Sequence, residues 1–331
     1  MEKFIFTYVD EDKEGIFRDL TSEEASTTLD YLPSHKRFTN YLLDKAEKLC
    51  LSYQLNSRVQ LPFTSVFCNF EGYAYDPQMT YHMIIPTTSI SKLTVKYLSA
   101  FRRRHPNVKL YALVTDSMHA SSPHMNLVRK KLFSDVWEKV LTYDKYDAEE
   151  YGFTWFGLTY YSSFDFVDSD SIKSDIYYVG YDKGGREQTI LDVYKKIRRE
   201  GGNARFDVVS DKPVDAESGL EYLKRRISYP EVVGRVKASN CILEVLQKNQ
   251  LAQSLRYFEA IVYNKKLLTN NPHITELPYY DARYMRVFCS LDDIDVEWVK
   301  RREGIDYGYS GEFSPLGLVT FIKELGKTTK G

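Results

Sequence analysis

Residues 239–271 read SNCILEVLQKNQLAQSLRYFEAIVYNKKLLTNN, and apolar and polar stretches alternate along them. It predicts an apolar strand at Cys241–Leu246, then a polar turn, then a helix that carries Arg256 and Glu259. A second apolar piece follows and ends on Asn270. The turn between a strand and a helix N-terminus presents free backbone N–H groups and the positive end of the helix dipole. The segment therefore predicts a site for a phosphate-bearing ligand.

Length, composition and net charge predict a soluble two-domain protein that does not bind nucleic acid. A chain of 331 residues predicts two domains of ordinary size. With 43% hydrophobic and 27% charged residues, the chain is expected to be soluble and ordered, with real cores. The net charge of −1 supplies no broad positive field, so we expect no nucleic-acid partner.

Cysteine usage and the N-terminus indicate a cytoplasmic protein. The four cysteines are far apart and form no CxxC pair, which predicts reduced thiols and neither a zinc site nor a redox pair. The opening MEKFIFTYVDEDKEG has too short an apolar run for a signal peptide. No apolar stretch reaches the ~20 residues that span a bilayer.

Strand-like and helical patterns alternate along the whole chain, which predicts parallel sheets built from βαβ units. The predicted strands include the apolar runs Ser65–Phe70 and Ala204–Val209. A stretch rich in Ser and Asp, SSFDFVDSDSIK at 162–173, is interpreted as the linker. The predicted architecture is two Rossmann-like α/β domains, 1–165 and 166–310, that face a cleft. Ligands in such sheets bind outside the carboxyl ends of the strands. A last segment, 311–331, holds an amphipathic helix over Phe313–Leu325.

Two groups of residues on the predicted second domain could hold a diphosphate. The first is the turn Gly180–Arg186, GYDKGGR, in which three glycines let the backbone approach a ligand and Lys183 and Arg186 supply charge. An ordinary turn with solvated charges is the alternative. The second is Gln253–Arg256 with Glu259, for which the alternative is a surface helix with an i,i+3 ion pair.

The residues VGYDKGG, ILEVLQ and SLRYFEAIVYNKKLLTNN resemble the nucleotide-sugar-binding domain of GT-B glycosyltransferases from bacterial capsule and lipopolysaccharide biosynthesis. The resemblance covers about residues 175–275. It implies a GT-B fold whose last helix crosses back to the first domain. It implies transfer of a sugar from a nucleotide diphosphate, UDP-type, to a surface polysaccharide or lipid-linked glycan, with no cofactor. The implied donor-binding residues are Gly180, Lys183, Arg186, Gln253, Ser254, Leu255, Arg256, Glu259 and Asn270.

Within that set, the resemblance gives Glu259 the donor ribose and the amides of Gln253–Arg256 the diphosphate. The chain departs from the pattern of the widespread retaining enzymes: their second glutamate falls on Leu251, and their phosphate-turn glycines fall on Ala252 and Ser254. Two alternatives therefore stay open. One is a non-glycosyl group transferase, such as a polysaccharide pyruvyltransferase, whose usual N-terminal glycine-rich signature is missing. The other is a non-catalytic binding subunit of the same fold.

An inverting transfer needs a general base within hydrogen-bond reach of the acceptor hydroxyl. The first half offers acids after predicted strands. We favour Asp116, which follows the strand KLYALVT at Lys109–Thr115, with Asp10, Glu71 and His119 as the other candidates. A turn-capping acid is the alternative for each carboxylate. A retaining enzyme would need no such base.

The DxD tripeptides Asp10–Asp12 and Asp168–Asp170 are the form of metal site used by GT-A enzymes, but both are interpreted as solvated acids, and no metal is expected. Four basic clusters could hold the protein at the inner face of a membrane that carries a lipid-linked acceptor. Solvated helix ends are the alternative. These clusters are Arg102–Arg104, Arg129–Lys131, Lys195–Arg199 and Lys224–Arg226.

Overall fold

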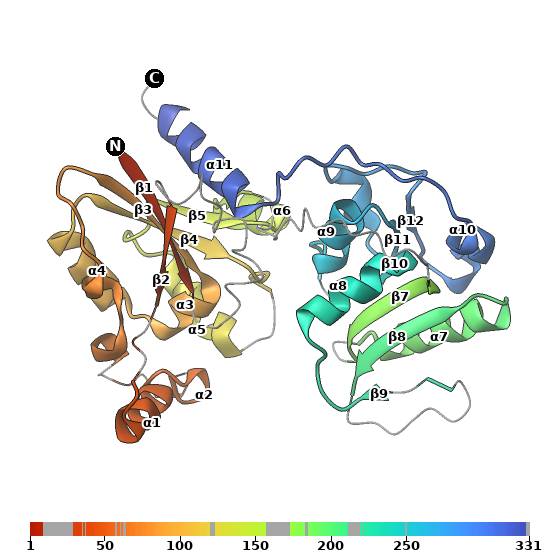
Figure 1. Cartoon of the computed structure of the whole chain (residues 1–331), viewed down its shortest axis with the longest axis horizontal. Coiled ribbons are helices and arrows are strands. Elements are labelled where there is room, and N and C mark those ends of the chain that lie inside the picture. The colour runs from red at the N-terminus through yellow and green to blue at the C-terminus, as the bar shows by residue number, and fades with distance from the viewer. Residues whose placement is uncertain are drawn as a thin grey trace. The chain divides into compact units, whose positions relative to one another are not determined.

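A computed structural model describes residues 1–8, 29–34, 36, 38–56, 58–59, 61, 64–119, 123–156, 173–182, 185–210, 219–220, 222–248 and 250–328. The chain divides into two compact units (Figure 1). The first comprises Met1–Tyr161 together with Glu312–Gly331, and the second comprises Ser162–Gly311.

The first unit is built on a parallel six-stranded sheet in the order β2-β1-β3-β4-β5-β6. Its strands are β1 Glu2–Tyr8, β2 Leu29–Pro33, β3 Thr80–Pro86, β4 Val108–Val114, β5 Lys139–Thr142 and β6 Thr154–Trp155. Its helices are α1 Tyr41–Cys50, α2 Tyr53–Asn56, α3 Thr87–Lys92, α4 Val95–Arg104, α5 Pro123–Leu132, α6 Lys145–Tyr151 and α11 Pro315–Thr328, with short 3-10 helices η3 Thr64–Phe67 and η4 Phe70–Gly72.

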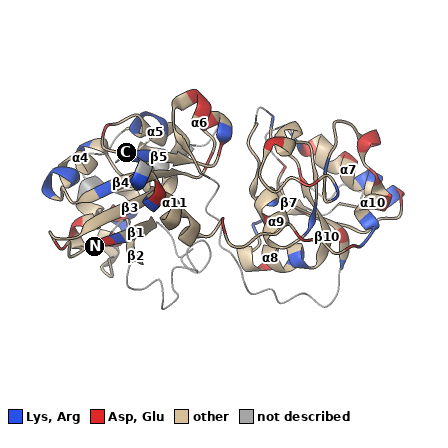
Figure 2. Ribbon diagram, turned by 90° about the horizontal axis from the view of Figure 1, so that it is seen from above, with Lys and Arg blue, Asp and Glu red and all other residues tan. Residues whose placement is uncertain are grey.

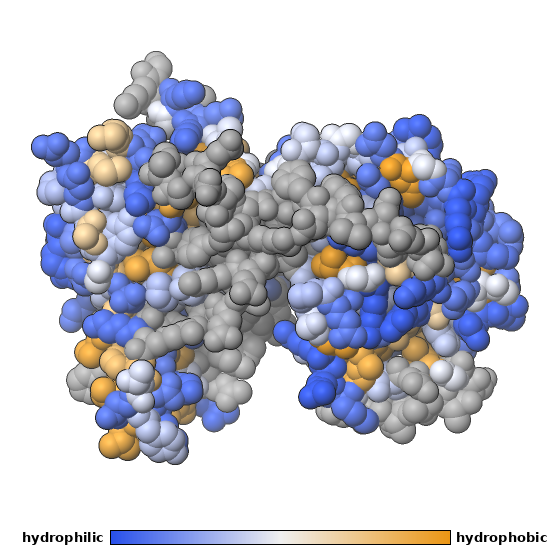
Figure 3. All heavy atoms as spheres, in the orientation of Figure 1, coloured by the Kyte–Doolittle hydropathy of each residue, from blue (hydrophilic) through white to orange (hydrophobic). Residues whose placement is uncertain are grey.

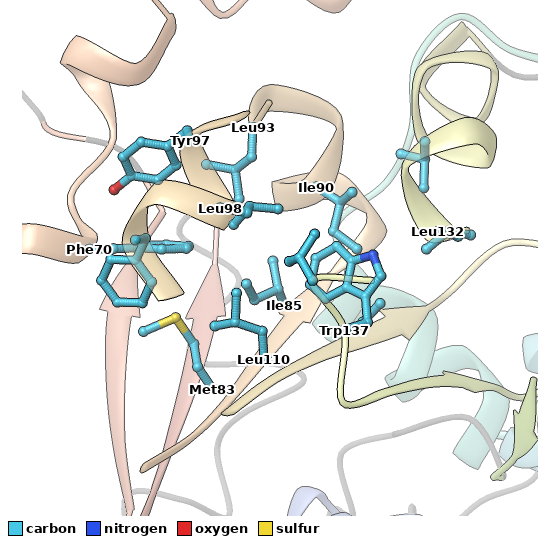
Figure 4. Close-up of a cluster of buried hydrophobic side chains, with 14 of the residues drawn as sticks. Phe70, Met83, Ile85, Ile90, Leu93, Tyr97, Leu98, Leu110, Leu132 and Trp137 are labelled. Carbon is cyan, nitrogen blue, oxygen red and sulfur yellow. The ribbon is translucent and has the colours of Figure 1, made fainter. Parts of the chain in front are cut away.

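Alternate residues of the central strands build two cores, one on each face of this sheet. Met83, Ile85 and Leu110 point to the face that α3, α4 and α5 cover, where Phe70 and Trp137 complete the packing (Figure 4). Because side chains alternate along a strand, the intervening residues point to the other face.

The last helix, α11, covers that other face. Its buried residues Leu318, Val319 and Ile322 pack against a cluster that includes Phe4 and Tyr111 of the sheet. The C-terminal helix thus belongs to the first unit, although the whole second unit precedes it in the sequence.

The second unit carries another parallel six-stranded sheet, in the order β12-β11-β10-β7-β8-β9. Numbered from β7 as the first strand, this is the 3-2-1-4-5-6 order of the dinucleotide-binding fold. Its strands are β7 Ser174–Tyr181, β8 Ala204–Val209, β9 Tyr222–Leu223, β10 Ser239–Glu244, β11 Lys266–Thr269 and β12 Met285–Val287. Its helices are α7 Glu187–Arg199, α8 Tyr229–Lys237, α9 Leu255–Val262 and α10 Val296–Lys300, with η5 Pro272–Glu276 and η6 Leu291–Asp293.

Helices cover both faces of this sheet. On one face, Ile190 and Val193 of α7 and Trp298 of α10 pack against Ile176 and Leu243. α8 and α9 pack against β7, β10 and β11. The predicted fold class, two Rossmann-like domains with a C-terminal helix on the first, is confirmed.

One predicted strand is wrong. The apolar run at Ser65–Phe70 forms η3 and enters η4. Phe70 lies in the helix-covered core of the first unit, against the rings of Tyr97 and Phe101 at 6.0 and 5.6 Å between centroids. The run is apolar because it closes that core, and consecutive buried residues do not require a sheet partner.

Candidate functional site

The candidate site lies at the carboxyl edge of the second sheet, at its topological switch point. β7 and β10 are neighbours, but the chain continues from β7 to β8 on one side and from β10 to β11 on the other. In open parallel sheets the crevice outside such a point is where ligands bind. α7 follows β7 and α9 follows β10, so two helix N-termini lie at this edge. Each helix presents the positive end of its dipole there. At α9, the N–H groups of Ser254 and Arg256 already donate to Glu244 and to the hydroxyl of Ser254.

Arg186 joins the loop after β7 to the loop after β10. Its Nε donates to the carbonyl oxygen of Tyr181 at 3.0 Å, and its Nη1 donates to that of Val245 at 3.1 Å. The preceding Gly185 has φ +77°, and a Cβ there would lie 3.5 Å from Cβ of Lys248. The left-handed backbone favours glycine at this position, and a Cβ there would be in ordinary contact with Lys248. The two hydrogen bonds of the Arg186 guanidinium hold the loops together.

Side chains at the ends of β10 and β11 also hold the loop after β10. Asn270 accepts the N–H of Leu246 through Oδ1 at 2.7 Å. Glu244, fully buried at the end of β10, accepts the N–H of Ser254 and the hydroxyl of Thr269, both at 2.6 Å. Burial raises the pKa of the Glu244 carboxyl. These three hydrogen bonds fix the loop between β10 and α9.

Arg256 and Glu259 form an ion pair inside the second unit. Their Nη1 and Oε2 atoms lie 2.8 Å apart, and Tyr229 of α8 donates its hydroxyl to Glu259 Oε1 at 3.0 Å. The Glu259 side chain is 0% exposed and that of Arg256 is 12% exposed. Burial raises the pKa of Glu259 to about 6, while the Arg256 cation acts in the opposite direction. The i,i+3 pair considered from the sequence exists, but it is buried instead of solvated.

This burial bears on the role expected for Glu259. The resemblance gives it a direct contact with the donor ribose, whereas both of its carboxylate oxygens are occupied by protein groups. Arg256 is the member of the pair with exposed surface.

The remaining predicted donor-binding residues lie at the same edge. Ser254 caps α9 by accepting the N–H of Arg256 at 3.2 Å, Gln253 is buried, and Leu255 is 39% exposed. Lys183 lies outside the described residues.

Gly180 is required by a close approach at the end of β7. A Cβ at this position would lie 2.6 Å from the hydroxyl of Tyr178 and 3.3 Å from Nη2 of Arg186. Tyr178 is buried in the core and its ring cannot move without repacking. The glycine therefore packs the strand end on Tyr178.

Replacing Gly180 with alanine is expected to lower the free energy of unfolding by about 1–3 kcal/mol, because the methyl group overpacks this contact. Chemical denaturation measures the change. Y178F/G180A should recover most of the loss, since the hydroxyl is gone. Gly234 in α8 has nothing within 4 Å of its built Cβ. G234A is the matched control and should stabilise by up to about 1 kcal/mol. Equal effects of G180A and G234A would contradict the close approach.

Beside this edge lies a basic hollow, formed by one of the clusters for which the sequence suggested contact with a membrane. Its volume is about 500 Å³, and it is lined by three cations, one carboxylate and Ser228: Lys224, Arg225, Arg226 and Glu231. The Arg226 guanidinium lies 5.0 Å from the ring centroid of Tyr181 and hydrogen-bonds its hydroxyl. Since Tyr181 ends β7, the hollow adjoins the switch point. In the sequence, this hollow is marked by three consecutive cations, Lys224–Arg226, which end two residues before Ser228, the N-cap of α8.

The first unit has a separate cluster of titratable groups at the carboxyl ends of β4 and β5 (Figure 2, acidic α6). His119 Nε2 lies 3.3 Å from Glu150 Oε2 and 3.9 Å from Asp147 Oδ1. Asp147 is fully buried and accepts the N–H of Met118 at 2.7 Å. Burial raises the pKa of Asp147 to about 6 although that N–H lowers it. Asp116, the base favoured from the sequence, is half-buried three residues before His119.

The raised pKa of Asp147 predicts how stability depends on pH. The folded protein binds more protons than the unfolded chain between the ordinary pKa of 3.8 and the folded value of about 6. Wild-type stability therefore falls as pH rises through this window. D147N should lack that fall and should gain on the wild type by up to about 3 kcal/mol by pH 7. Denaturation at a series of pH values measures the difference. D135N, at an exposed acid of the same unit, is the control, and a D147N curve parallel to it would contradict the assignment.

The other base candidates are placed differently. Glu71 lies in η4 and pairs with Arg104 and with His105, the latter at 2.9 Å, and it is exposed. It does not follow a strand, because the strand predicted before it is absent. Asp10 lies outside the described residues, as do both DxD tripeptides, Asp10–Asp12 and Asp168–Asp170.

In the described part of the chain, no three or more His, Cys, Asp or Glu side chains are grouped so that they could hold a metal ion. Over the same residues, no helix has both the length and the apolar character needed to cross a membrane.

No protein-family model matches the chain, and no curated protein sequence is similar to it. Several solved structures are similar in shape. A UDP-forming α,α-trehalose-phosphate synthase from Burkholderia vietnamiensis has a TM-score of 0.45 and 9% identity, over 90% of each chain. The β-glucosyltransferase of phage T4 has 0.44 and 14%, over 90% of this chain and 88% of that one. A UGT2 of Phytolacca americana, complexed with UDP-2fluoro-glucose and pterostilbene, has 0.42 and 9%, over 91% and 89%.

These likenesses are too distant to assign an activity to this chain. What is established is its fold class: two Rossmann-like α/β domains, with the last helix packed on the first.

Proposed function

We propose that this chain is a glycosyltransferase that takes a sugar from a nucleotide-diphosphate sugar, UDP-type, at the switch point of its second unit. The observation that carries the proposal is the carboxyl edge between β7 and β10. Two helix N-termini, the Arg186 guanidinium and the exposed part of Arg256 lie there, beside the basic hollow. Such an edge favours a ligand with two adjacent negative groups.

The same groups suit the chemical step. Breaking the bond between the sugar and the diphosphate leaves negative charge on the departing nucleotide, and fixed N–H dipoles and guanidinium groups stabilise that charge. Glu259 and Tyr229 hold Arg256 in place, which makes Glu259 a positioning residue in this proposal. No metal is assigned to the step.

A base on the first unit would accept the proton of the acceptor hydroxyl in an inverting transfer. We assign this role to His119, whose Nε2 faces Glu150 and Asp147, so that the ring is oriented by carboxylates. Asp116 is the alternative. The acceptor is proposed to be a surface polysaccharide or a lipid-linked glycan, glycosylated on the cytoplasmic side of the membrane.

Thermal unfolding with a panel of nucleotides tests the donor site. UDP is expected to raise the melting temperature of the wild type, because a ligand that binds only the folded state stabilises it. R186A should lose most of that shift, since the two loops come apart. R199A removes an equally cationic but exposed side chain at the end of α7 and is the matched control. If no nucleotide or nucleotide sugar shifts the wild-type transition, the proposal fails.

A non-catalytic nucleotide-binding subunit is the second candidate. It is favoured by Leu251, which is 44% exposed on the loop after β10, where the resemblance expects a carboxylate. Donor hydrolysis separates the two. The glycosyltransferase should release UDP from its donor with or without a chelator, whereas the binding subunit should shift its melting temperature but release none.

A further inference from the structure

The first unit exposes an apolar surface around α1. Among the described residues, fourteen large apolar side chains are strongly exposed, and seven of them lie within residues 41–66. We call this surface the α1 face. In Figure 3 it is the group of orange spheres at the lower left, where Figure 1 has α1 and α2. Its residues are Tyr41, Leu42, Leu43, Leu49, Leu55, Val59 and Val66.

The apolar side of α1 faces outward, which is the reverse of an ordinary amphipathic surface helix. A surface helix normally buries its apolar stripe and turns polar residues to water. Here Leu42 and Leu49, seven residues apart and therefore on one side of the helix, are 74% and 58% exposed, whereas Glu47 is buried. The N-cap Asn40 accepts the N–H of Leu42 at 2.9 Å and fixes the start of the helix. The outward leucines are thus a built feature of a capped helix.

Cations surround these apolar side chains. Lys36, Lys45, Lys48 and Arg58 are exposed. Of the two acids of α1, Asp44 is half-buried and pairs with Lys48 at 2.8 Å, and Glu47 is buried. Four cations and two acids leave a charge of +2 among these described residues. Lys45 Nζ lies 4.5 Å from the ring centroid of Tyr41, so an aromatic ring and an ammonium group stand together at the rim.

We propose that the α1 face docks the protein on a lipid surface that carries anionic headgroups. Outward leucines with lysines beside them, and a tyrosine at the rim, are the composition of helices that lie in a membrane interface. The cations add attraction to anionic lipid, at short range because salt screens it. A second copy of this chain is a poorer occupant, because a two-fold interface would set the four exposed cations of this face against those of the other copy.

This docking adds a location to the proposed function and does not depend on it.

It also replaces part of the expectation that the basic clusters of the sequence contact a membrane. Lys131, in one of the basic clusters predicted for membrane contact, is mostly buried and donates to the carbonyl oxygens of Ile90, Ser91 and Leu93 at 3.0, 3.1 and 2.6 Å. It caps α3 and is not available to a headgroup.

Vesicle co-sedimentation of the whole chain tests the proposal. Wild-type protein should bind vesicles of phosphatidylcholine mixed with phosphatidylglycerol much more tightly than phosphatidylcholine alone, and added salt should weaken that binding. L42S/L49S should reduce partitioning into the vesicles by about 100-fold, because the two leucine side chains that would be buried in the lipid are lost. K45Q/R58Q should reduce it by about fivefold per charge, and only on the anionic vesicles.

L291S/L316S is the matched control, since both of those leucines are 38% exposed outside the α1 face. It should bind as the wild type does. Sedimentation velocity on the same samples tests the competing occupant: a wild-type dimer that L42S/L49S converts to monomer overturns the proposal. Equal binding by the wild type and L42S/L49S, or no binding by the wild type, also overturns it. The UDP-dependent melting shift should persist in L42S/L49S, which separates failure of docking from failure of the donor site.

Discussion

Replacing Arg256 with alanine is expected to abolish the UDP-dependent melting shift and to lower the free energy of unfolding by about 3–5 kcal/mol. The loss of stability follows from Glu259, which stays fully buried while its partner cation is removed. The loss of binding follows from the position of Arg256 at the start of α9. Chemical denaturation and thermal unfolding with UDP measure the two effects.

A double variant separates stability from binding at this site. In R256M/E259M both charges are replaced by apolar side chains, so no uncompensated charge remains, and most of the stability should return. UDP should still cause no shift, because the guanidinium is absent. If R256M/E259M binds UDP as the wild type does, the buried pair is a structural feature alone and the assignment of Arg256 is wrong.

Substituting alanine for His119 is expected to lower kcat for transfer by about 10²–10⁴-fold and to leave the UDP-dependent melting shift unchanged. The reason is that His119 sits on the first unit with two carboxylates and supplies no contact to the nucleotide in this account. Release of UDP from a donor, to water or to an added acceptor, measures the rate. D116N should lose tenfold at most.

His273 provides the matched control for this prediction. It forms a similar surface pair with Glu276 at 3.0 Å, but on the second unit and outside the titratable cluster. H273A should keep its kcat. Full activity in H119A together with a large loss in D116N would move the base to Asp116. Full activity in both would indicate a retaining reaction, which needs no such base.

Much of the fold follows from the sequence because strand and helix periods differ. The run at Ala204–Val209 was predicted as a strand and is one over the same residues, β8. The short strands β6, β9 and β12 could not be predicted in this way. They have two or three residues each, and only a neighbouring strand defines them.

The site was less predictable than the fold for a similar reason. Local order is enough to place Arg186 after a strand and Glu259 in a helix. It does not show that Tyr229, thirty residues from Glu259, closes the pair from another helix. The contact between His119 and Asp147 likewise joins residues that only the packing of α6 brings together. Long-range contacts of this kind decide which charged residues are buried and which face a ligand.

Hydrogen exchange of the whole chain with and without UDP locates the donor site. UDP is expected to slow exchange at the amides of Gly185 and Arg186 and of Gln253–Arg256, which lie at the two helix N-termini of the switch point. Amides of the first unit should be unaffected by the nucleotide alone. If UDP binds but exchange at these amides is unchanged, or if the protected amides lie elsewhere, the placement of the donor site is contradicted.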